Sequence, residues 1–170
     1  MRVYRASRRP GGGLGNFDPL DASASVARNG WCFNDRKSPI LYAAEVEALA
    51  SLEVAARPGW DSLTELWVAA IELPDASVVD LDTLGIVLPS NWNARPAAPS
   101  ARAISGEFLA AVDRAATRGH RVCGLRVPSV ISSSDHNVLI DPRRAQATAA
   151  RYRVPGWSRA PFDWLAATAT

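Results

Sequence analysis

The 170-residue sequence has little histidine, cysteine or lysine, and the first two shortages exclude whole classes of site. Neither His120 nor His136 has a Cys, Asp or His partner at metal-ligand spacing, so no metal site is predicted. The two cysteines, Cys32 and Cys123, are too few for a disulfide framework, which favours a reducing compartment, the cytoplasm. Because neither cysteine has a histidine at a spacing typical of cysteine nucleophiles, we expect both to be small buried apolar residues.

Long apolar runs and a large net charge are also missing. No run of about 18 apolar residues occurs, so no membrane-spanning segment is predicted. The formal net charge of +2 gives no reason to expect direct binding to nucleic acid or to an anionic membrane. Arg8 and Arg9 resemble a twin-arginine export signal, but the glycines at 11–13 form no hydrophobic region, so export is not expected.

The pattern of apolar and turn residues predicts one domain over residues 1–170. Strands and helices mix in it without strict alternation, which is typical of the α+β class. Strands are predicted at residues 2–6, 40–42, 63–73, 77–81, 122–127 and 137–140. Helices are predicted at 43–56 and, with Ser105 as a cap and Gly119 as the stop, at 105–119; one further turn is expected near 21–27. The aromatic residues among the prolines of the tail at 155–170 favour packing of this tail on the domain.

The predicted helix at 43–56 carries a carboxylate where a carboxylate is costly. Glu53 falls within an apolar stripe at helical spacing, which consists of Val46, Leu49, Ala50 and Ala56. An unpaired carboxylate on a buried face costs several kcal/mol. Glu53 is therefore either half of a buried ion pair or a working group in a cleft. Arg57, four residues on, offers a purely structural partner worth about 0.2–0.5 kcal/mol when exposed.

Other polar side chains stand at the ends of predicted strands, and they make a set with Glu53. Arg5 ends the first strand, Tyr42 the second, Ser129 follows the strand at 122–127, and Asn137 opens the next. Tyr42 precedes Glu53 by eleven residues, close to three helical turns, which predicts that both lie on one side of a cleft. Each of these four residues also has a purely structural interpretation. Arg5 would be a surface charge, Tyr42 a ring of the core, and Ser129 and Asn137 turn residues.

These residues, in this order, resemble the RES-domain family, which is named for its Arg, Glu and Ser. The resemblance covers residues 2–142 and rests on Val-Tyr-Arg at 3–5, Pro-Ile-Leu-Tyr at 39–42, Ala-Leu-Ala-Ser-Leu-Glu at 48–53, Leu-Arg-Val-Pro-Ser at 125–129 and Asn-Val-Leu-Ile-Asp-Pro at 137–142. The Phe162-Asp163 pair in the tail also looks like the ending of the family. Members of the family are the toxins of RES–Xre toxin–antitoxin pairs. The resemblance implies a single domain with an ADP-ribosyltransferase-like mixed sheet and flanking helices.

It also implies that NAD is consumed as a substrate, with no prosthetic group and no metal. Glu53 would hold the hydroxyls of the nicotinamide ribose and stabilise the positive charge that develops there, while Tyr42 would line the nicotinamide pocket. Ser129 would bond a ribose or the carboxamide, and Arg5 would meet the diphosphate or a ribose. Water or inorganic phosphate would then attack the anomeric carbon.

Asn137 and Arg28 complete the NAD-binding residues that we carry over from the resemblance. The resemblance further implies a cognate Xre-type antitoxin that covers the cleft and forms a hetero-oligomer with the chain. The leading hypothesis is thus a cytoplasmic NAD glycohydrolase or phosphorylase. Transfer of ADP-ribose to a cellular protein, and a non-catalytic domain that only binds a partner, are the alternatives.

One departure from the family pattern bears on these alternatives. The family usually has Gly-Arg-Trp-Asn ahead of the strand that ends in tyrosine, and here the matching stretch at 30–34 is Gly-Trp-Cys-Phe-Asn. Counted back from Tyr42, Cys32 stands at the position of the family arginine. A second departure is Arg57, where the family often has a histidine. Arg28, Arg36 and Arg57 are the candidates for a replacement cation.

Overall fold

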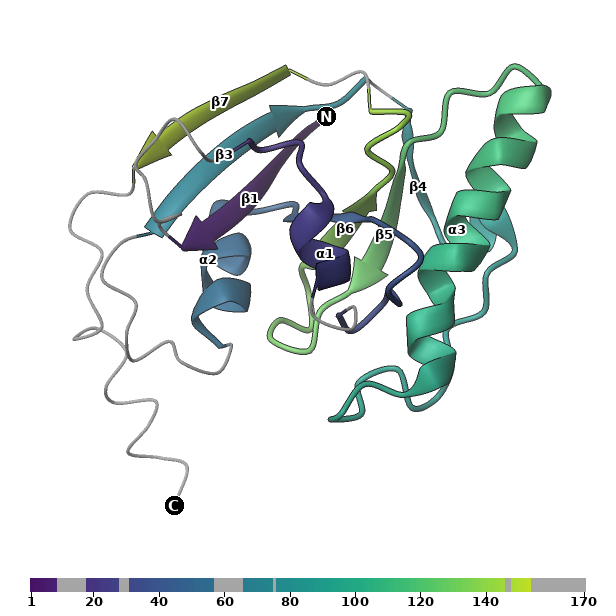
Figure 1. Ribbon diagram of the computed structural model, residues 1–170, viewed down its shortest axis with the longest axis horizontal. Helices are drawn as coiled ribbons and strands as arrows, with labels where there is room; N and C mark the ends of the chain where they lie inside the picture. Colours follow the sequence, from purple (N-terminus) through teal and green to yellow (C-terminus); the bar gives the residue numbers. More distant parts are fainter. Residues whose placement is uncertain (9–17, 28–30, 57–65, 75, 146–147, 154–170) are drawn as a thin grey trace.

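The computed structural model describes residues 1–8, 18–27, 31–56, 66–74, 76–145 and 148–153 (Figure 1). The strands are β1 (Arg2–Arg8), β2 (Leu41–Ala44), β3 (Leu66–Glu72), β4 (Val78–Asp80), β5 (Gly124–Pro128), β6 (His136–Ile140) and β7 (Thr148–Arg153). The helices are α1 (Ser23–Ala27), α2 (Glu47–Ala55), the 3₁₀ turn η3 (Asp82–Leu84) and α3 (Pro99–Thr117). This mixture confirms the predicted α+β class.

The described strands form one sheet in the order β4-β5-β6-β2-β1-β3-β7, antiparallel except for the β4–β5 pair. The sheet is weakly joined at one place. β1 pairs with β3 along its whole length, whereas a single registered pair, Tyr4 with Ala44, joins β1 to β2. The sheet therefore opens between β1 and β2, and this opening positions the site described below.

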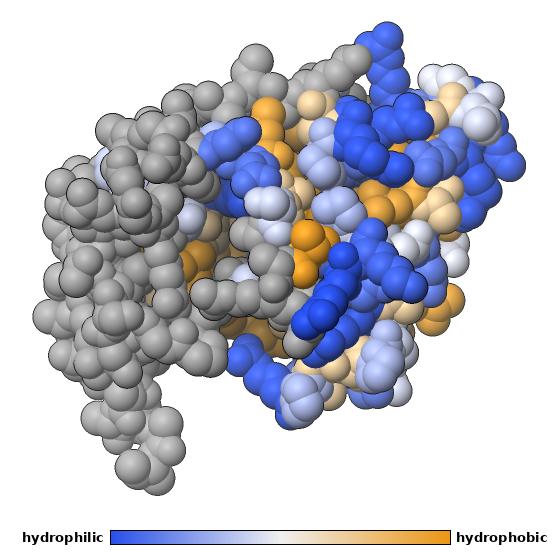
Figure 2. Space-filling model, in the orientation of Figure 1, coloured by the Kyte–Doolittle hydropathy of each residue, from blue (hydrophilic) through white to orange (hydrophobic). Residues whose placement is uncertain are grey.

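Helices α2 and α3 pack on the same face of the sheet, one on each side of this opening. Ile104, Phe108 and Val112 of α3 bury against β5 and β6, and Phe108 is completely inaccessible. Burial of such a side chain contributes about 1.5–3 kcal/mol. Leu49 and Val54 of α2 lie against the β1 side of the opening. Figure 2 shows hydrophilic side chains over much of the coloured outer surface, with smaller apolar patches between them.

The opposite face carries its own apolar cluster and lies on the side of α1. Its members alternate along the strands with those of the first face: Val3, Leu41, Ala43, Trp67, Ala69, Ile71, Val138 and Ile140. Ala22, next to α1, packs into this cluster. Among the described residues, no helix has both the length and the apolar character needed to cross a bilayer.

The structure corrects the predicted helix at 43–56, because α2 begins only at Glu47. Ala43 and Ala44 instead finish β2, where they pair with Val138 and Asn137 of β6. Strand pairing between distant segments thus overrides the high helix propensity of alanine. Tyr42 and Glu53 are therefore not separated by three helical turns, as the sequence predicted, because Tyr42 lies in β2 and Glu53 in α2.

The predicted apolar stripe was also partly wrong. Val46 is extended and 38% exposed, and Ala56 is exposed, whereas Leu49, Ala50, Val54 and Ala55 are buried. At the other long helix, α3 begins six residues before the predicted cap, with Pro99 in its first turn. Proline suits this position because its missing N–H has no intrahelical partner there. Ser105 is consequently a buried interior residue of α3 and not its cap. The tail at 155–170 lies outside the described residues.

Candidate active site

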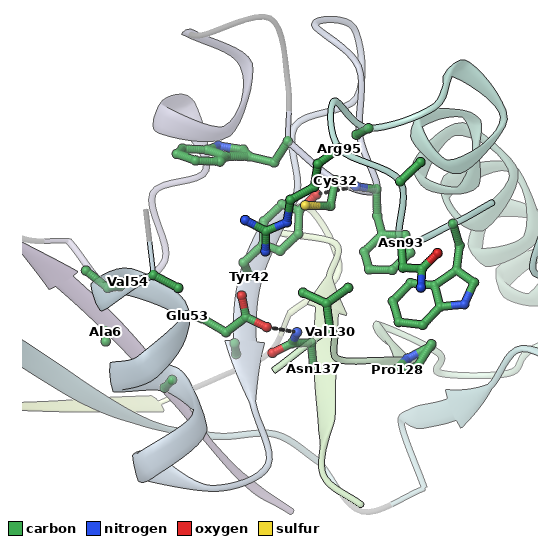
Figure 3. Close-up of a pocket in the computed structure, with 18 of the residues that line it drawn as sticks. Ala6, Cys32, Tyr42, Glu53, Val54, Asn93, Arg95, Pro128, Val130 and Asn137 are labelled. Carbon is green, nitrogen blue, oxygen red and sulfur yellow. Dashed lines mark hydrogen bonds between the residues drawn. The ribbon is translucent and has the colours of Figure 1, made fainter. Parts of the chain in front are cut away.

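A cavity of about 220 Å³ lies where the sheet opens between β1 and β2 (Figure 3). Tyr4 and Ala6 of β1, Tyr42 of β2 and Asn137 of β6 reach it from the sheet. Helix α2, the end of β5, the turn at 31–33 and the loop at 92–97 supply the remaining walls. Most of this lining is apolar, so the few polar groups in it are the ones able to orient a ligand.

Glu53 is held in this cavity by two neutral donors. The hydroxyl of Ser129 donates to Oε1 at 2.8 Å, and Nδ2 of Asn137 donates to the same oxygen at 2.6 Å. The backbone N–H of Ile131 donates in turn to the Ser129 hydroxyl at 3.0 Å. Figure 3 shows the second carboxylate oxygen pointing away from Asn137, on the side of Tyr42. Within the described residues, Oε2 has no hydrogen bond, so Glu53 has an acceptor to offer a ligand.

This geometry favours the cleft interpretation of Glu53 over the buried ion pair. The carboxylate is half-buried, and its described partners are a serine and an asparagine rather than a cation. Ser129 and Asn137 are themselves almost fully buried, at 7% and 9% exposure, so they fix Oε1 firmly. Arg57, the structural partner considered from the sequence, lies outside the described residues.

Tyr42 lines the cavity with its ring, while its hydroxyl holds a neighbouring turn. The hydroxyl donates to Oδ1 of Asn34 at 2.9 Å and accepts the backbone N–H of Phe33 at 3.1 Å. Asn34 is completely buried, and its Nδ2 donates to three backbone carbonyls, those of Ser25, Asp35 and Ser38. The tyrosine therefore fixes the turn that brings Trp31 and Cys32 to the cavity wall.

The loop at 92–97 forms the part of the wall next to this turn and is fixed to it. The ring of Trp92 stacks on that of Phe33, with centroids 6.0 Å apart and an interplanar angle of 12°. The hydroxyl of Ser100, in the first turn of α3, donates to Oδ1 of Asn91 at 3.1 Å. The loop presents Asn93 and the exposed Arg95 to the cavity, where Figure 3 shows Arg95 beside Tyr42 and Cys32.

The family model described as RES domain matches residues 2–164. The chain belongs to the RES-domain family. Among solved structures, it is similar to a chain of the crystal structure of the M. tuberculosis MbcT–MbcA toxin–antitoxin complex, with a TM-score of 0.63. The two chains are 17% identical over 98% of this chain and 89% of that one, a similarity that shows the shared fold. No curated protein matches the chain.

The fold of this RES domain brings four of the six predicted site residues together. Tyr42, Glu53 and Asn137 line the cavity, and Ser129 bonds Glu53 beside it. Their roles toward NAD stay predictions. Arg28 lies outside the described residues.

Arg5 does not reach the cavity. Side chains alternate along a strand, and since Tyr4 and Ala6 line the cavity, Arg5 projects from the other face of the sheet. There its guanidinium donates to the backbone carbonyl of Pro19 at 2.6 Å, ahead of α1. The predicted contact between Arg5 and the diphosphate is thus not supported by this geometry. Arg5 ties the segment before α1 to the sheet.

The two cysteines of the RES domain differ, which corrects the expectation that both are buried. Cys123 is buried, and burial raises the pKa of its thiol. Cys32 is exposed and lines the cavity, at the position where the family arginine is expected. Of the candidates for a replacement cation, Arg36 does not line the cavity, and Arg28 and Arg57 lie outside the described residues.

Three lining residues were not predicted from the sequence: Trp31, Trp92 and Arg95, which is the cation of the lining as far as the residues are described. Residues 89–100 are rich in proline and alanine, a composition that by itself predicts only a connection between elements. Their Asn-Trp-Asn run at 91–93 was the available signal, because a tryptophan between polar residues is unusual in a simple connection.

Proposed function

We propose that this RES domain is the NAD-consuming toxin of a toxin–antitoxin pair and cleaves the nicotinamide–ribose bond of NAD by hydrolysis or phosphorolysis. The observation that carries the proposal is the Glu53 carboxylate, whose Oε1 is fixed by Ser129 and Asn137 while Oε2 remains available to a ligand. Membership in the RES-domain family and the fold shared with a chain of a toxin–antitoxin complex support it.

Cleavage of the nicotinamide–ribose bond requires a group that stabilises positive charge on the ribose, and Glu53 in the cavity can supply it. As the bond between nicotinamide and the anomeric carbon breaks, its electron pair leaves with nicotinamide and positive charge develops on the ribose. A fixed carboxylate next to that ribose stabilises the charge without reorganising, and the loss of one such group typically slows catalysis about 100- to 1,000-fold. Oε2 of Glu53 accepts hydrogen bonds from the ribose hydroxyls in this arrangement.

The second step is attack on the anomeric carbon by water or by inorganic phosphate. The new carbon–oxygen bond restores the neutral sugar, and with water as the nucleophile a proton is released to solvent. The products are nicotinamide and ADP-ribose, or ADP-ribose 1″-phosphate when phosphate attacks. Apolar walls, including the rings of Tyr42 and Trp31, suit a planar nicotinamide and limit the access of bulk water to the reacting carbon. NAD acts in this proposal as substrate, with no prosthetic group.

The proposal includes a protein partner, because an enzyme that depletes NAD has to be held inactive in the cell that makes it. We expect a small Xre-type antitoxin that forms a hetero-oligomer with the chain and covers the mouth of the cavity. The solved complex of a chain with this fold supports such a partner. A neighbouring gene for a helix-turn-helix protein, whose coexpression relieves growth arrest, is the expected observation.

The decisive experiment compares purified wild-type protein with Glu53→Gln for nicotinamide release from NAD, with and without phosphate. Glutamine keeps an oxygen that accepts from Ser129 and Asn137 but carries no charge, so release is expected to fall at least about 100-fold. Glu107→Gln, the same change on an exposed position of α3, is the matched control and keeps full activity. Wild-type protein that releases no nicotinamide, or Glu53→Gln protein as active as the control, overturns the proposal.

Radiolabelled NAD, added to a cell lysate, separates the alternatives. A labelled protein band that depends on Glu53 indicates transfer of ADP-ribose to a protein instead of hydrolysis or phosphorolysis. NAD binding without any turnover indicates a domain that only binds.

A further inference from the structure

We propose that Arg95 binds a phosphate group at the mouth of the cavity and thereby sets which end of the substrate enters. This inference rests on the proposed function, and it concerns a residue outside the set predicted from the sequence. Arg95 lines the cavity from the loop at 92–97, and its side chain is exposed. No hydrogen bond or ion pair joins it to any described residue.

The free guanidinium sets Arg95 apart from arginines that serve the fold. Arg126 is bound by Glu45 at 2.7 Å and Asp80 at 2.8 Å. Arg143 is bound by the completely buried Asp141 at 2.9 Å. The positive charge of these arginines is balanced by carboxylates of the protein itself. The charge of Arg95 is available to a ligand.

The charges in the cavity form a simple pattern. Among the described residues that line it, Glu53 and Arg95 are the ones with a full charge, and they come from different walls, α2 and the 92–97 loop. Glu53 is half-buried, whereas Arg95 is exposed at the entrance. A ligand that satisfies both has hydroxyls or a developing positive charge at its inner end and an anion at its outer end. A nicotinamide ribose joined to a phosphate has this polarity.

The volume of the cavity agrees with a ligand that places one end inside the cavity and its anionic part at the entrance. Pockets that bury a whole drug-sized ligand generally measure about 300–1,000 Å³. The described walls enclose about 220 Å³, so they suit one end of a dinucleotide with its phosphates at the entrance. A guanidinium binds phosphate through two parallel N–H···O bonds, which makes arginine well suited to this position.

The surroundings of Arg95 hold its backbone in place for such a role. Trp92, three residues before it, stacks on Phe33, whose backbone N–H is bound by the Tyr42 hydroxyl. The backbone N–H of Ala94 donates to the carbonyl of Asn91 at 3.0 Å, which closes a turn directly before Arg95. Arg95 thus belongs to a loop whose backbone is fixed by these contacts. It lies in the same wall of the cavity as Cys32, the residue at the position of the family arginine.

Two sources of phosphate share this chemistry, the diphosphate of NAD and free inorganic phosphate that attacks the ribose. The experiment measures KM and kcat for NAD at several phosphate concentrations in wild-type, Arg95→Ala and Arg95→Lys protein. Arg118→Ala, a change at the exposed C-terminal end of α3, is the control. Hydrogen bonds to a charged group are worth enough to raise KM about 10- to 100-fold when they are lost, with kcat nearly unchanged. Lysine keeps the charge but not the paired donors, so its effect is intermediate.

A higher KM for NAD identifies the diphosphate as the bound group, and a higher KM for inorganic phosphate with an unchanged KM for NAD identifies free phosphate. Unchanged KM values for both, or equal effects of Arg95→Ala and Arg118→Ala, overturn the inference.

Calorimetric binding of ADP-ribose separates this inference from the proposed function, because it needs no turnover. If wild-type protein binds ADP-ribose and Arg95→Ala binds it at least about tenfold more weakly, Arg95 holds phosphate even where NAD is not cleaved. If wild-type protein cleaves NAD and Arg95→Ala binds ADP-ribose and both substrates as tightly, the proposed function stands and the role of Arg95 fails.

Discussion

The hydroxyl of Tyr42 donates a hydrogen bond to the side-chain oxygen of Asn34, 2.9 Å away, and so ties β2 to the turn at 31–34. The same oxygen of Asn34 accepts the backbone N–H of Trp31 at 2.9 Å. The buried Asn34 therefore connects Tyr42 to Trp31, and both residues line the cavity. The wall residue Trp92 is connected through Phe33. Tyr42 acts on the cavity through this turn as well as through its own ring.

Tyr42→Phe is expected to destabilise the fold and to weaken substrate binding together. The change leaves the buried Phe33 N–H without an acceptor and removes one donor from Asn34, at a cost of about 1–3 kcal/mol in the free energy of unfolding. Urea unfolding measures this cost. KM for NAD is expected to rise because the 31–34 turn loosens.

A double-mutant cycle with Asn34→Ala provides the control for this prediction. Asn34→Ala costs more by itself, since three backbone carbonyls lose their donor. The double variant is expected to be more stable than the sum of the two single losses implies, by about 0.5–3 kcal/mol, because the two residues share one interaction. Additive losses would show that the Tyr42–Asn34 bond contributes nothing.

Ser129→Ala is expected to lower kcat about tenfold or more with little change in KM. The serine hydroxyl is one of two donors that fix Oε1 of Glu53, and hydrogen bonds to charged groups are worth about 1.5–3 kcal/mol. Ser133→Ala, in the exposed part of the following loop, is the matched control. Steady-state nicotinamide release by the two variants checks the prediction, and equal activity would contradict it.

The location of Glu53 was predictable because it rests on a local signal, a carboxylate within an apolar helical stripe. The details of that stripe were not predictable, since the boundary between β2 and α2 depends on pairing with β6, nearly a hundred residues away in the chain. Local propensity favours helix at Ala43 and Ala44, and the sheet overrides it. The α+β class and the family could be predicted from the sequence pattern because they depend on many elements at once, and the fold and the family model confirm both.

The position of Arg5 outside the cavity has a different physical cause. Alternation along β1 fixes that Tyr4 and Arg5 face opposite sides of the sheet, but the sequence does not reveal which side holds the cavity. That choice depends on where α2 packs. Arg95 escaped prediction because it belongs to a loop, where no periodicity distinguishes a wall from a connection. The stacking of Trp92 on Phe33, which brings this loop to the cavity, joins segments far apart in sequence.

The buried thiol of Cys123 is expected to make the protein less stable at alkaline pH. Burial raises the pKa of this thiol in the folded state, so the unfolded chain loses the proton at a lower pH than the native protein does. The stabilisation is fully present below the thiol pKa of the unfolded chain, about 8.5, and is lost as pH rises through the folded value. Urea unfolding between pH 7 and 10 measures it. Cys123→Ala should flatten this decline, and Cys32→Ala, the control, should leave it as in the wild type.

Cys32 is expected to react with a thiol reagent in the native protein and to be protected by a ligand in the cavity. Its side chain is exposed and lines the cavity beside Arg95, whereas Cys123 is buried. Ellman's reagent at neutral pH should therefore modify one thiol per native chain, and two after unfolding. Cys32→Ser should abolish the native reaction and Cys123→Ser should preserve it. ADP-ribose or NAD, added to the Glu53→Gln protein so that little NAD is consumed, should slow modification of Cys32 in proportion to occupancy. A rate that saturating ligand leaves unchanged would place the binding site away from this cavity.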